Sequence, residues 1–210
     1  KIKNSIKFAL KQIEKINEKI LSKKLFPLVL GGEHSITSGS IRPFVKKFNN
    51  LHILHFDAHA DLRESYEGEK FSHATAMKRC LDFKNVKIVS FGIRNLSREE
   101  MNFYNKNKKR INIFWSKEKK KWNIKKIRKL FKSKNVYITF DVDGLDSSIM
   151  PATGTPEPGG MLWEEVLPII KKVCQISNVV GADINELAPI KNFDSYNFLV
   201  AKLAYKILSY

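Results

Sequence analysis

The sequence contains little cysteine and no long apolar run, and these absences narrow the class of protein. Only two of its 210 residues are cysteines, Cys80 and Cys174, and they form neither a CxxC pair nor a disulfide framework. No stretch approaches the roughly 20 apolar residues that span a bilayer, and the first residues lack the apolar core of a secretion signal. We therefore expect reduced thiols, a cytoplasmic chain and no membrane partner.

Acidic residues are scarce relative to basic ones. The chain has 38 lysines and arginines against 21 aspartates and glutamates, which gives a formal net charge of +17. The lysines are scattered over helix faces and concentrate between Lys106 and Lys134, without a groove-reading motif beside them. Basic charge alone supports only non-specific attraction to nucleic acid. We therefore expect no nucleic-acid partner.

What the sequence does contain is an alternation of extended and helical periodicities. Its hydrophobic content of 43% suffices for one sizeable core. The pattern predicts strands at 25–30, 51–56, 86–91, 111–114, 136–140 and 179–184. It predicts helices at 2–20, 36–48, 73–81, 97–107, 121–131, 162–174 and 193–208. We expect residues 1–210 to form a single α/β domain, a three-layer α/β/α sandwich with a mainly parallel sheet.

Candidate metal ligands follow three of the expected strands at their carboxyl ends. After the strand at 51–56, Asp57, His59 and Asp61 stand at alternating positions, so an extended backbone would send their side chains the same way. Two more carboxylates alternate after the strand at 136–140, and an imidazole follows the strand at 25–30. The six candidates are His34, Asp57, His59, Asp61, Asp141 and Asp143.

This set has too many ligands for one zinc ion. Four carboxylates and two imidazoles suit two hard-to-borderline divalent ions that share bridging carboxylates and keep positions open for water. Without a cation between them, the clustered carboxylates would repel one another. Mixed imidazole and carboxylate ligation fits manganese better than magnesium, with iron, cobalt and nickel as alternatives. The sequence therefore predicts a binuclear centre at the carboxyl edge of the sheet.

Several motifs in the chain resemble those of the ureohydrolases, the arginase and agmatinase family. They are Gly31-Gly-Glu-His34, Asp57-Ala-His-Ala-Asp61, Ser72-His73, Phe140-Asp-Val-Asp-Gly-Leu-Asp146, the proline- and glycine-rich segment 151–160 and Asp183-Ile-Asn-Glu186. Together they are specific because they occur in the family's order. Ser147 and Ala152 depart from the family's usual proline and glycine. Ureohydrolases generally carry further amino-terminal sequence, so we expect that this chain lacks an amino-terminal segment.

The resemblance implies which ligands each ion takes. One manganese ion would be held by His34, Asp57, Asp61 and Asp141, and the other by His59, Asp57, Asp141 and Asp143. Asp57 and Asp141 would bridge the two ions. A water molecule between two such cations ionises near neutrality, and it would attack the guanidinium carbon of a substrate.

The resemblance also implies catalytic roles for three side chains. Asp61 would accept a hydrogen bond from the attacking water, and His73 would shuttle a proton near the leaving amine. Glu186 would bind the planar guanidinium through paired hydrogen bonds. Glu33 and Asp146 would orient ligands from behind. His55 is expected to be a core residue or a supporting one, because it lies one step deeper on the ligand strand.

The segment 62–73 is similar to that of bacterial and archaeal agmatinases, and it lacks the loop by which arginases hold the amino-acid end of arginine. Glu64, Glu67 and Glu69 are expected to favour a substrate with a second cation. The resemblance thus implies a homo-oligomeric agmatinase, a trimer or hexamer, that makes urea and putrescine in polyamine biosynthesis. Arginase, guanidinobutyrase and aminopropylagmatine ureohydrolase activities remain alternatives. A zinc deacetylase of related fold and an inactive metal-binding homologue are less favoured.

Overall fold

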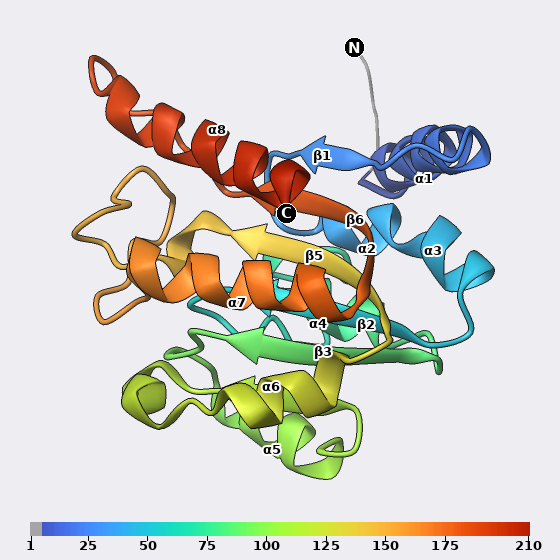
Figure 1. Cartoon of the computed structure of the whole chain (residues 1–210), viewed down its shortest axis with the longest axis horizontal. Helices are drawn as coiled ribbons and strands as arrows, with labels where there is room; N and C mark the ends of the chain where they lie inside the picture. The colour runs from blue at the N-terminus through green and yellow to red at the C-terminus, as the bar shows by residue number, and fades with distance from the viewer. Residues whose placement is uncertain (1–5) are drawn as a thin grey trace.

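A computed structural model describes residues 6–210, in which the strands form one six-stranded sheet (Figure 1). The strands are β1 (Leu28–Leu30), β2 (Leu51–Phe56), β3 (Val86–Phe91), β4 (Ile111–Phe114), β5 (Asn135–Asp141) and β6 (Asn178–Asn185). Their order is β1-β6-β5-β2-β3-β4, and each of these pairings is parallel. The first residues of the expected helix at 2–20 lie outside the described residues.

Helices cover both faces of the sheet (Figure 1). One face packs against α1 (Ile6–Ser22), α2 (Ile36–Ser40), α3 (Arg42–Lys47), α4 (Ala76–Cys80) and α5 (Arg98–Lys106). The other packs against α6 (Ile124–Phe131), α7 (Trp163–Ile176) and α8 (Asp194–Ser209). The predicted fold class, an α/β protein with a mainly parallel sheet, is confirmed. Among residues 6–210, no helix combines the length and apolar character needed to cross a membrane.

Three of the expected helices are interrupted, and the strand expected at 25–30 is shorter, Leu28–Leu30. The helix expected at 73–81 begins as a 3-10 helix, His73–Thr75, ahead of α4. The other two are interrupted for local reasons. The helix expected at 36–48 divides at Ile41, and Pro43 lies in the first turn of α3, where a missing N–H breaks no helical hydrogen bond. The helix expected at 121–131 begins only at Ile124. Its N-cap is Asn123, whose side chain accepts a hydrogen bond from the N–H of Lys125 at 2.8 Å. The lysine-rich stretch before it, Ser116–Lys121, is a 3-10 helix.

The register of the central strands determines where their carboxyl ends lie. β2 is buried along its whole length, which explains why four of its six residues are apolar. Phe56 at its end pairs with Phe140 of β5, and Phe140 pairs with Ile184 of β6. Asp57 and Asp141 therefore leave adjacent strands at the same level. This is the edge where ligands bind in parallel sheets.

The buried side chain of His52 makes the stability of the fold depend on pH. It lies on β2 with 6% of its surface exposed, its Nδ1 has no hydrogen-bond partner, and its ring centre lies 6.4 Å from that of Phe131. Burial, followed by repulsion from Lys87 and Lys134, lowers the pKa of His52 from 6.5 to about 4. Between these two values the unfolded chain binds the proton and the folded chain does not, so stability falls as the pH is lowered through this window.

We expect this single group to cost up to about 3 kcal/mol of unfolding free energy on acidification through the window. His52→Phe removes the titration, so the variant should lose less stability than the wild type over the same pH range. Urea unfolding of both proteins at the two ends of the window measures the difference, in which the titrations of other groups cancel. Parallel pH profiles for the two proteins would show that His52 does not have the lowered pKa.

Candidate active site

The carboxyl edge of the sheet brings five of the six candidate ligands together in two overlapping clusters, whereas Asp141, the other expected bridging ligand, lies in neither. One contains His34, His55, Asp57 and Asp61, and the other contains Asp57, His59 and Asp143. Within each cluster, one potential ligand atom per residue lies within 4.8 Å of the others. Asp57 belongs to both clusters, as expected of a carboxylate shared between two ions. Their roles as ligands stay predictions.

The backbone reaches this arrangement differently from the way the sequence pattern suggested. β2 ends at Phe56, so Asp57, His59 and Asp61 do not continue an extended strand. Asp61 instead adopts the left-handed conformation, with φ 53°, which turns its side chain back toward the sheet. Asp143 lies in a 3-10 helix, Val142–Gly144, rather than one strand step beyond Asp141. The pattern therefore identified neighbouring residues but not the turns that bring them together.

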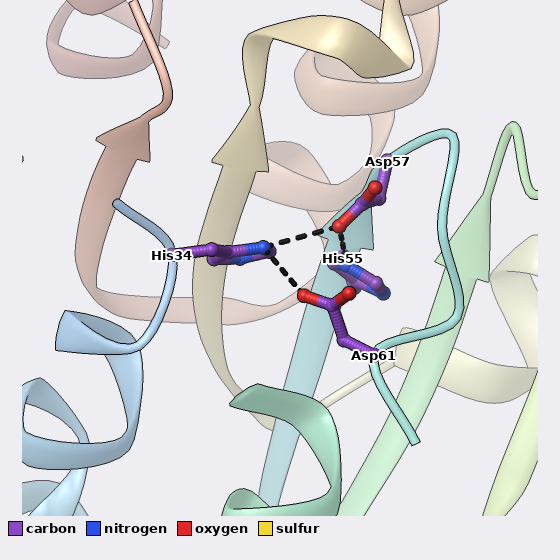
Figure 2. Close-up of side chains that lie close together, drawn as sticks. All are labelled: His34, His55, Asp57 and Asp61. Carbon is purple, nitrogen blue, oxygen red and sulfur yellow. Dashed lines mark hydrogen bonds and ion pairs between the residues drawn. The ribbon is translucent and has the colours of Figure 1, made fainter. Parts of the chain in front are cut away.

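His34 faces three carboxylates, two of the first cluster, Asp57 and Asp61 (Figure 2), and that of Asp141 beside it. Its Nδ1 lies 2.9 Å from an oxygen of Asp61, 3.1 Å from Asp57 and 3.4 Å from Asp141. All four residues are buried, and Nδ1 has no directional hydrogen bond in spite of these short distances.

The second nitrogen of His34, Nε2, is held by a side-chain hydrogen bond. Nε2 lies 2.9 Å from the hydroxyl of Thr139, and that hydroxyl donates its hydrogen to Asp183 at 2.6 Å. Because the hydroxyl hydrogen is already used, Nε2 is the donor and Nδ1 is the nitrogen that faces the carboxylates. Burial opposes the charge of His34, yet the nearby carboxylates of Asp57 and Asp61 raise its pKa well above 6.5. A proton on Nδ1 thus occupies the place among the carboxylate oxygens that a bound cation would take.

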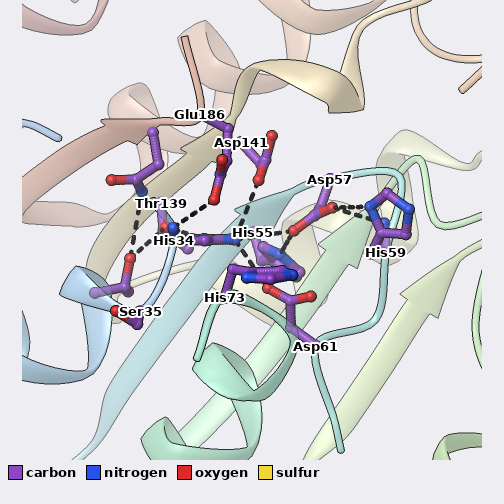
Figure 3. Close-up of polar contacts among 12 residues, drawn as sticks. His34, Ser35, His55, Asp57, His59, Asp61, His73, Thr139, Asp141 and Glu186 are labelled. Carbon is purple, nitrogen blue, oxygen red and sulfur yellow. Dashed lines mark hydrogen bonds and ion pairs between the residues drawn. The ribbon is translucent and has the colours of Figure 1, made fainter. Parts of the chain in front are cut away.

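The second cluster is held by main-chain donors. His59 Nδ1 lies 3.0 Å from Asp143 and 3.6 Å from Asp57 (Figure 3 shows His59 beside Asp57). Asp57 accepts a hydrogen bond from the N–H of His59 at 2.6 Å, and Asp143 accepts one from the N–H of Ala58 at 3.0 Å. Asp141 accepts one from the N–H of Asp143 at 2.9 Å. These bonds fix the carboxylates without neutralising them.

The crowding of like charges appears in the protonation equilibria. Burial, followed by repulsion from Asp57, raises the pKa of Asp61 to about 7. Burial and the charges of Asp143 and Asp57 likewise raise the pKa of Asp141 well above its usual value. Burial opposes the charge of His59, yet the carboxylates of Asp143 and Asp57 raise its pKa to about 11. Protons thus balance the buried carboxylates here, and hard oxygen and imidazole donors of this kind fit divalent cations.

A pocket of about 370 Å³ opens above the clusters, and Glu186 lines it. The Glu186 carboxylate accepts a hydrogen bond from the N–H of His34 at 2.7 Å, and its backbone is left-handed with φ 66° (Figure 3). A glutamate in this conformation carries backbone strain of order 1 kcal/mol or more. Such a conformation persists where the surroundings fix a side chain. Here the Glu186 carboxylate is held beside the candidate centre.

His73 also lines the pocket but is less constrained. Half of its side chain, 52%, is exposed, and its ring lies edge-on to Tyr66 with centres 5.1 Å apart. Its Nδ1 lies 3.8 Å from Glu33 and 3.4 Å from the hydroxyl of Ser72. An exposed imidazole with loose partners can exchange protons between the pocket and solvent. Its catalytic role stays a prediction.

The supporting residues differ in part from those expected. Asp146 accepts hydrogen bonds from the main chain of Ser148 and Gly160, so it closes the loop between them instead of orienting a ligand. Glu33 contacts Ser35 and His73 rather than a ligand. His55 does support the centre, since its Nε2 lies 2.8 Å from Asp57 and its Nδ1 2.9 Å from the hydroxyl of Ser90.

The supporting roles of two residues were not predicted from the sequence, although one of them, Asp183, belongs to a quoted motif. Thr139 and Asp183 are fully buried on neighbouring strands, and together they fix the ring of His34. Their signal was present, because each is a polar residue inside an apolar strand. The pattern did not show which imidazole they would support.

The acidic segment does not form the pocket wall as expected. Glu64 binds Lys78 at 2.7 Å and Arg79 at 3.0 Å, so its charge is already compensated by α4. The lining contains Arg63 and Tyr66 from this segment, but not Glu64, Glu67 or Glu69. Among the described lining residues, the carboxylate away from the centre is that of Glu100, which lies 3.6 Å from Arg63.

Comparison with known proteins agrees with this geometry. A model of the arginase family matches residues 2–209. The chain is 35% identical over 189 residues to N(1)-aminopropylagmatine ureohydrolase of Synechocystis sp., covering 88% of this chain and 60% of that protein. It is 36% identical over 184 residues to agmatinase of Bacillus subtilis, covering 87% and 62%. The chain thus spans about three fifths of the length of these curated relatives.

A solved structure of similar sequence has the same fold. The agmatine ureohydrolase of Thermoplasma volcanium superposes with a TM-score of 0.84 at 35% identity, and the match covers 97% of this chain and 68% of that one.

Proposed function

Because the chain belongs to the arginase family, we propose that it is an agmatinase, a binuclear metal hydrolase that converts agmatine to urea and putrescine. One observation carries the proposal: two clusters of ligands share Asp57 beneath a pocket into which Glu186 is aimed. The similarity to a protein named agmatinase supports the choice of substrate. Production of putrescine would place the enzyme in polyamine biosynthesis.

The residues present fit two divalent ions. His34, Asp57, Asp61 and Asp141 would hold one, and His59, Asp57, Asp141 and Asp143 would hold the other. Hard oxygen and imidazole donors support manganese, although related divalent ions share this preference. When bound, such a pair supplies the Lewis acidity that brings the pKa of a water molecule near neutrality.

The side chains around the pocket would then perform the remaining steps. The Glu186 carboxylate binds the guanidinium and holds its carbon in reach of the attacking water. Asp61 orients that water by accepting a hydrogen bond from it. As the water oxygen bonds to the carbon, the water gives up a proton to Asp61, the bond to the alkyl-bearing nitrogen breaks, and this nitrogen leaves as an amine. His73 delivers the proton that the amine needs to leave.

We further propose a single domain that works as a cytoplasmic homo-oligomer. One sheet with one site supports the single domain, and two free cysteines support a reducing compartment. Large exposed apolar side chains on α8 support association, since Phe198 is 70% exposed and Tyr205 61%. A trimer or a hexamer is the expected assembly.

The substrate assignment predicts a preference for agmatine over arginine. The two share the guanidinium, so discrimination must arise where their far ends differ, at the wall that contains Glu100. Arg63 is already paired with Glu100, so the α-carboxylate of arginine would lack a free cationic partner there. We expect kcat/KM for agmatine to exceed that for arginine by about tenfold or more, equivalent to about 1.4 kcal/mol.

Urea release from the manganese-loaded full chain measures this preference, with arginine, guanidinobutyrate and aminopropylagmatine as competing substrates. An equal or larger kcat/KM for any of these three would replace the agmatinase assignment with the corresponding activity. Absence of urea from all four would overturn the ureohydrolase chemistry itself.

A further inference from the structure

Arg94, which follows β3, joins three separate loops beside the candidate centre. It is half-buried, and its guanidinium donates hydrogen bonds to main-chain carbonyl oxygens only. The acceptors are Gly92 at 3.1 Å, Asp143 at 2.7 Å, Leu145 at 3.2 Å, Glu157 at 2.7 Å and Pro158 at 3.0 Å. A planar guanidinium with donors in a fixed fork can join several carbonyls at once, whereas the ammonium of lysine cannot reproduce this arrangement.

The loop that Arg94 holds is the proline- and glycine-rich segment 151–160, and it contacts two candidate ligands. Thr155 donates a hydrogen bond from its hydroxyl to Asp143 at 2.9 Å. The Glu157 carboxylate accepts one from the side-chain amide of Asn95 at 2.7 Å, and it lies 3.9 Å from Nε2 of His59. One segment thus touches both Asp143 and the outward nitrogen of His59.

The main chain of Arg94 is tied to the ligand loop as well. Its N–H donates to the carbonyl of Ala58 at 2.9 Å, and the N–H of Ala58 donates in turn to the carboxylate of Asp143 at 3.0 Å. Arg94 therefore connects the backbone beside His59, the backbone of Asp143 itself, and the segment 151–160.

We propose that Arg94 is a positioning residue that fixes segment 151–160 across Asp143 and His59 and so presets these two ligands for their metal ion. This role deepens the proposed binuclear function and rests on it. Arg94 reaches the centre through other residues, since its own side-chain hydrogen bonds end on carbonyl oxygens.

If Arg94 acts only through its charge, its loss should change metal affinity in the opposite direction from the loss of a positioning residue. Its guanidinium lies near the carboxylates of Asp143, Asp57 and Glu157, so as a charge alone it disfavours a cation at the centre. Removing that charge would tighten metal binding. Removing a positioning residue would weaken it, because the freed ligands must be ordered when the ion binds.

The test measures the number of Mn²⁺ ions bound by the full chain and their affinities, by calorimetric titration, together with the shift in Tm that Mn²⁺ produces. We expect Arg94→Ala to weaken one of two ions by about tenfold or more, with Arg94→Lys in between. Arg110→Ala is the matched control. Arg110 also donates to main-chain carbonyls, those of Leu81, Phe83 and Val86, but it lies at the amino-terminal ends of the strands, away from the candidate centre. The Arg110→Ala variant should have a lower Tm and unchanged Mn²⁺ affinities.

A second pair of variants covers the case in which Arg94→Ala does not fold. Thr155→Val removes only the hydroxyl that holds Asp143, whereas the hydroxyl of Thr153 in the same segment has no hydrogen-bond partner. We expect Thr155→Val to weaken one ion severalfold and Thr153→Val to bind as the wild type does.

The outcomes separate this inference from the proposed function. Unchanged or tighter Mn²⁺ binding in Arg94→Ala, or equal affinities in the two threonine variants, would overturn the positioning role and leave the hydrolase assignment standing. A wild-type chain that binds fewer than two ions would overturn the binuclear assignment, and the positioning role with it.

Discussion

Replacing Asp57 with asparagine is expected to release at least one metal ion and to reduce kcat by about a thousandfold or more, equivalent to about 4 kcal/mol. The carboxylate lies in both ligand clusters, 3.1 Å from Nδ1 of His34 and 3.6 Å from that of His59. Asparagine keeps the shape but removes the charge that both ions share. Elemental analysis of the purified variant and its urea release measure the two effects.

His73→Asn is the contrasting variant for Asp57→Asn. His73 lines the same pocket but lies outside both ligand clusters, so its replacement should keep both ions and lower kcat alone. Loss of metal from His73→Asn would show that its proton-transfer role is misassigned. Two ions and ordinary turnover in Asp57→Asn would show that Asp57 does not bridge.

Gly144→Ala is expected to destabilise the fold by about 3 kcal/mol, because the added methyl group has no room. A Cβ at Gly144 would lie 2.7 Å from the nitrogen of Asp57 and 3.0 Å from the carbonyl carbon of Phe56. Both are main-chain atoms at the end of a central strand, so relief of the clash would move Asp57 and the ligands around it.

Gly154→Ala is the matched control for Gly144→Ala, because a Cβ at Gly154 would meet no atom within 4 Å. Its stability should stay within about 0.5 kcal/mol of the wild type. Urea unfolding of the three proteins without metal measures the effect independently of catalysis. Equal stability of the two variants would show that the turn after β5 can shift away from β2 at little cost.

The sequence alone was sufficient to predict the order of strands and helices, with differences at their ends, and to select candidate ligands, because both depend on local information. β2 is buried along its whole length, and four of its six residues are apolar, so the strand can be recognised without knowledge of its partners. The polar residues that follow it, Asp57, His59 and Asp61, stand out against it for the same reason. The repeated order of strand and helix was also sufficient to predict a parallel sheet.

The tertiary structure decided which groups meet, because these contacts join residues far apart in the chain. Thr139 and Asp183 come from different strands, and only the pairing of β5 with β6 places them together behind His34. Glu64 was expected in the pocket, but Lys78 and Arg79 of α4 bind it instead. A local pattern records the charge of such a side chain but not its partner. The left-handed turn at Asp61 is likewise a backbone conformation that the surrounding packing selects, and no alternation of residues in the sequence could have predicted it.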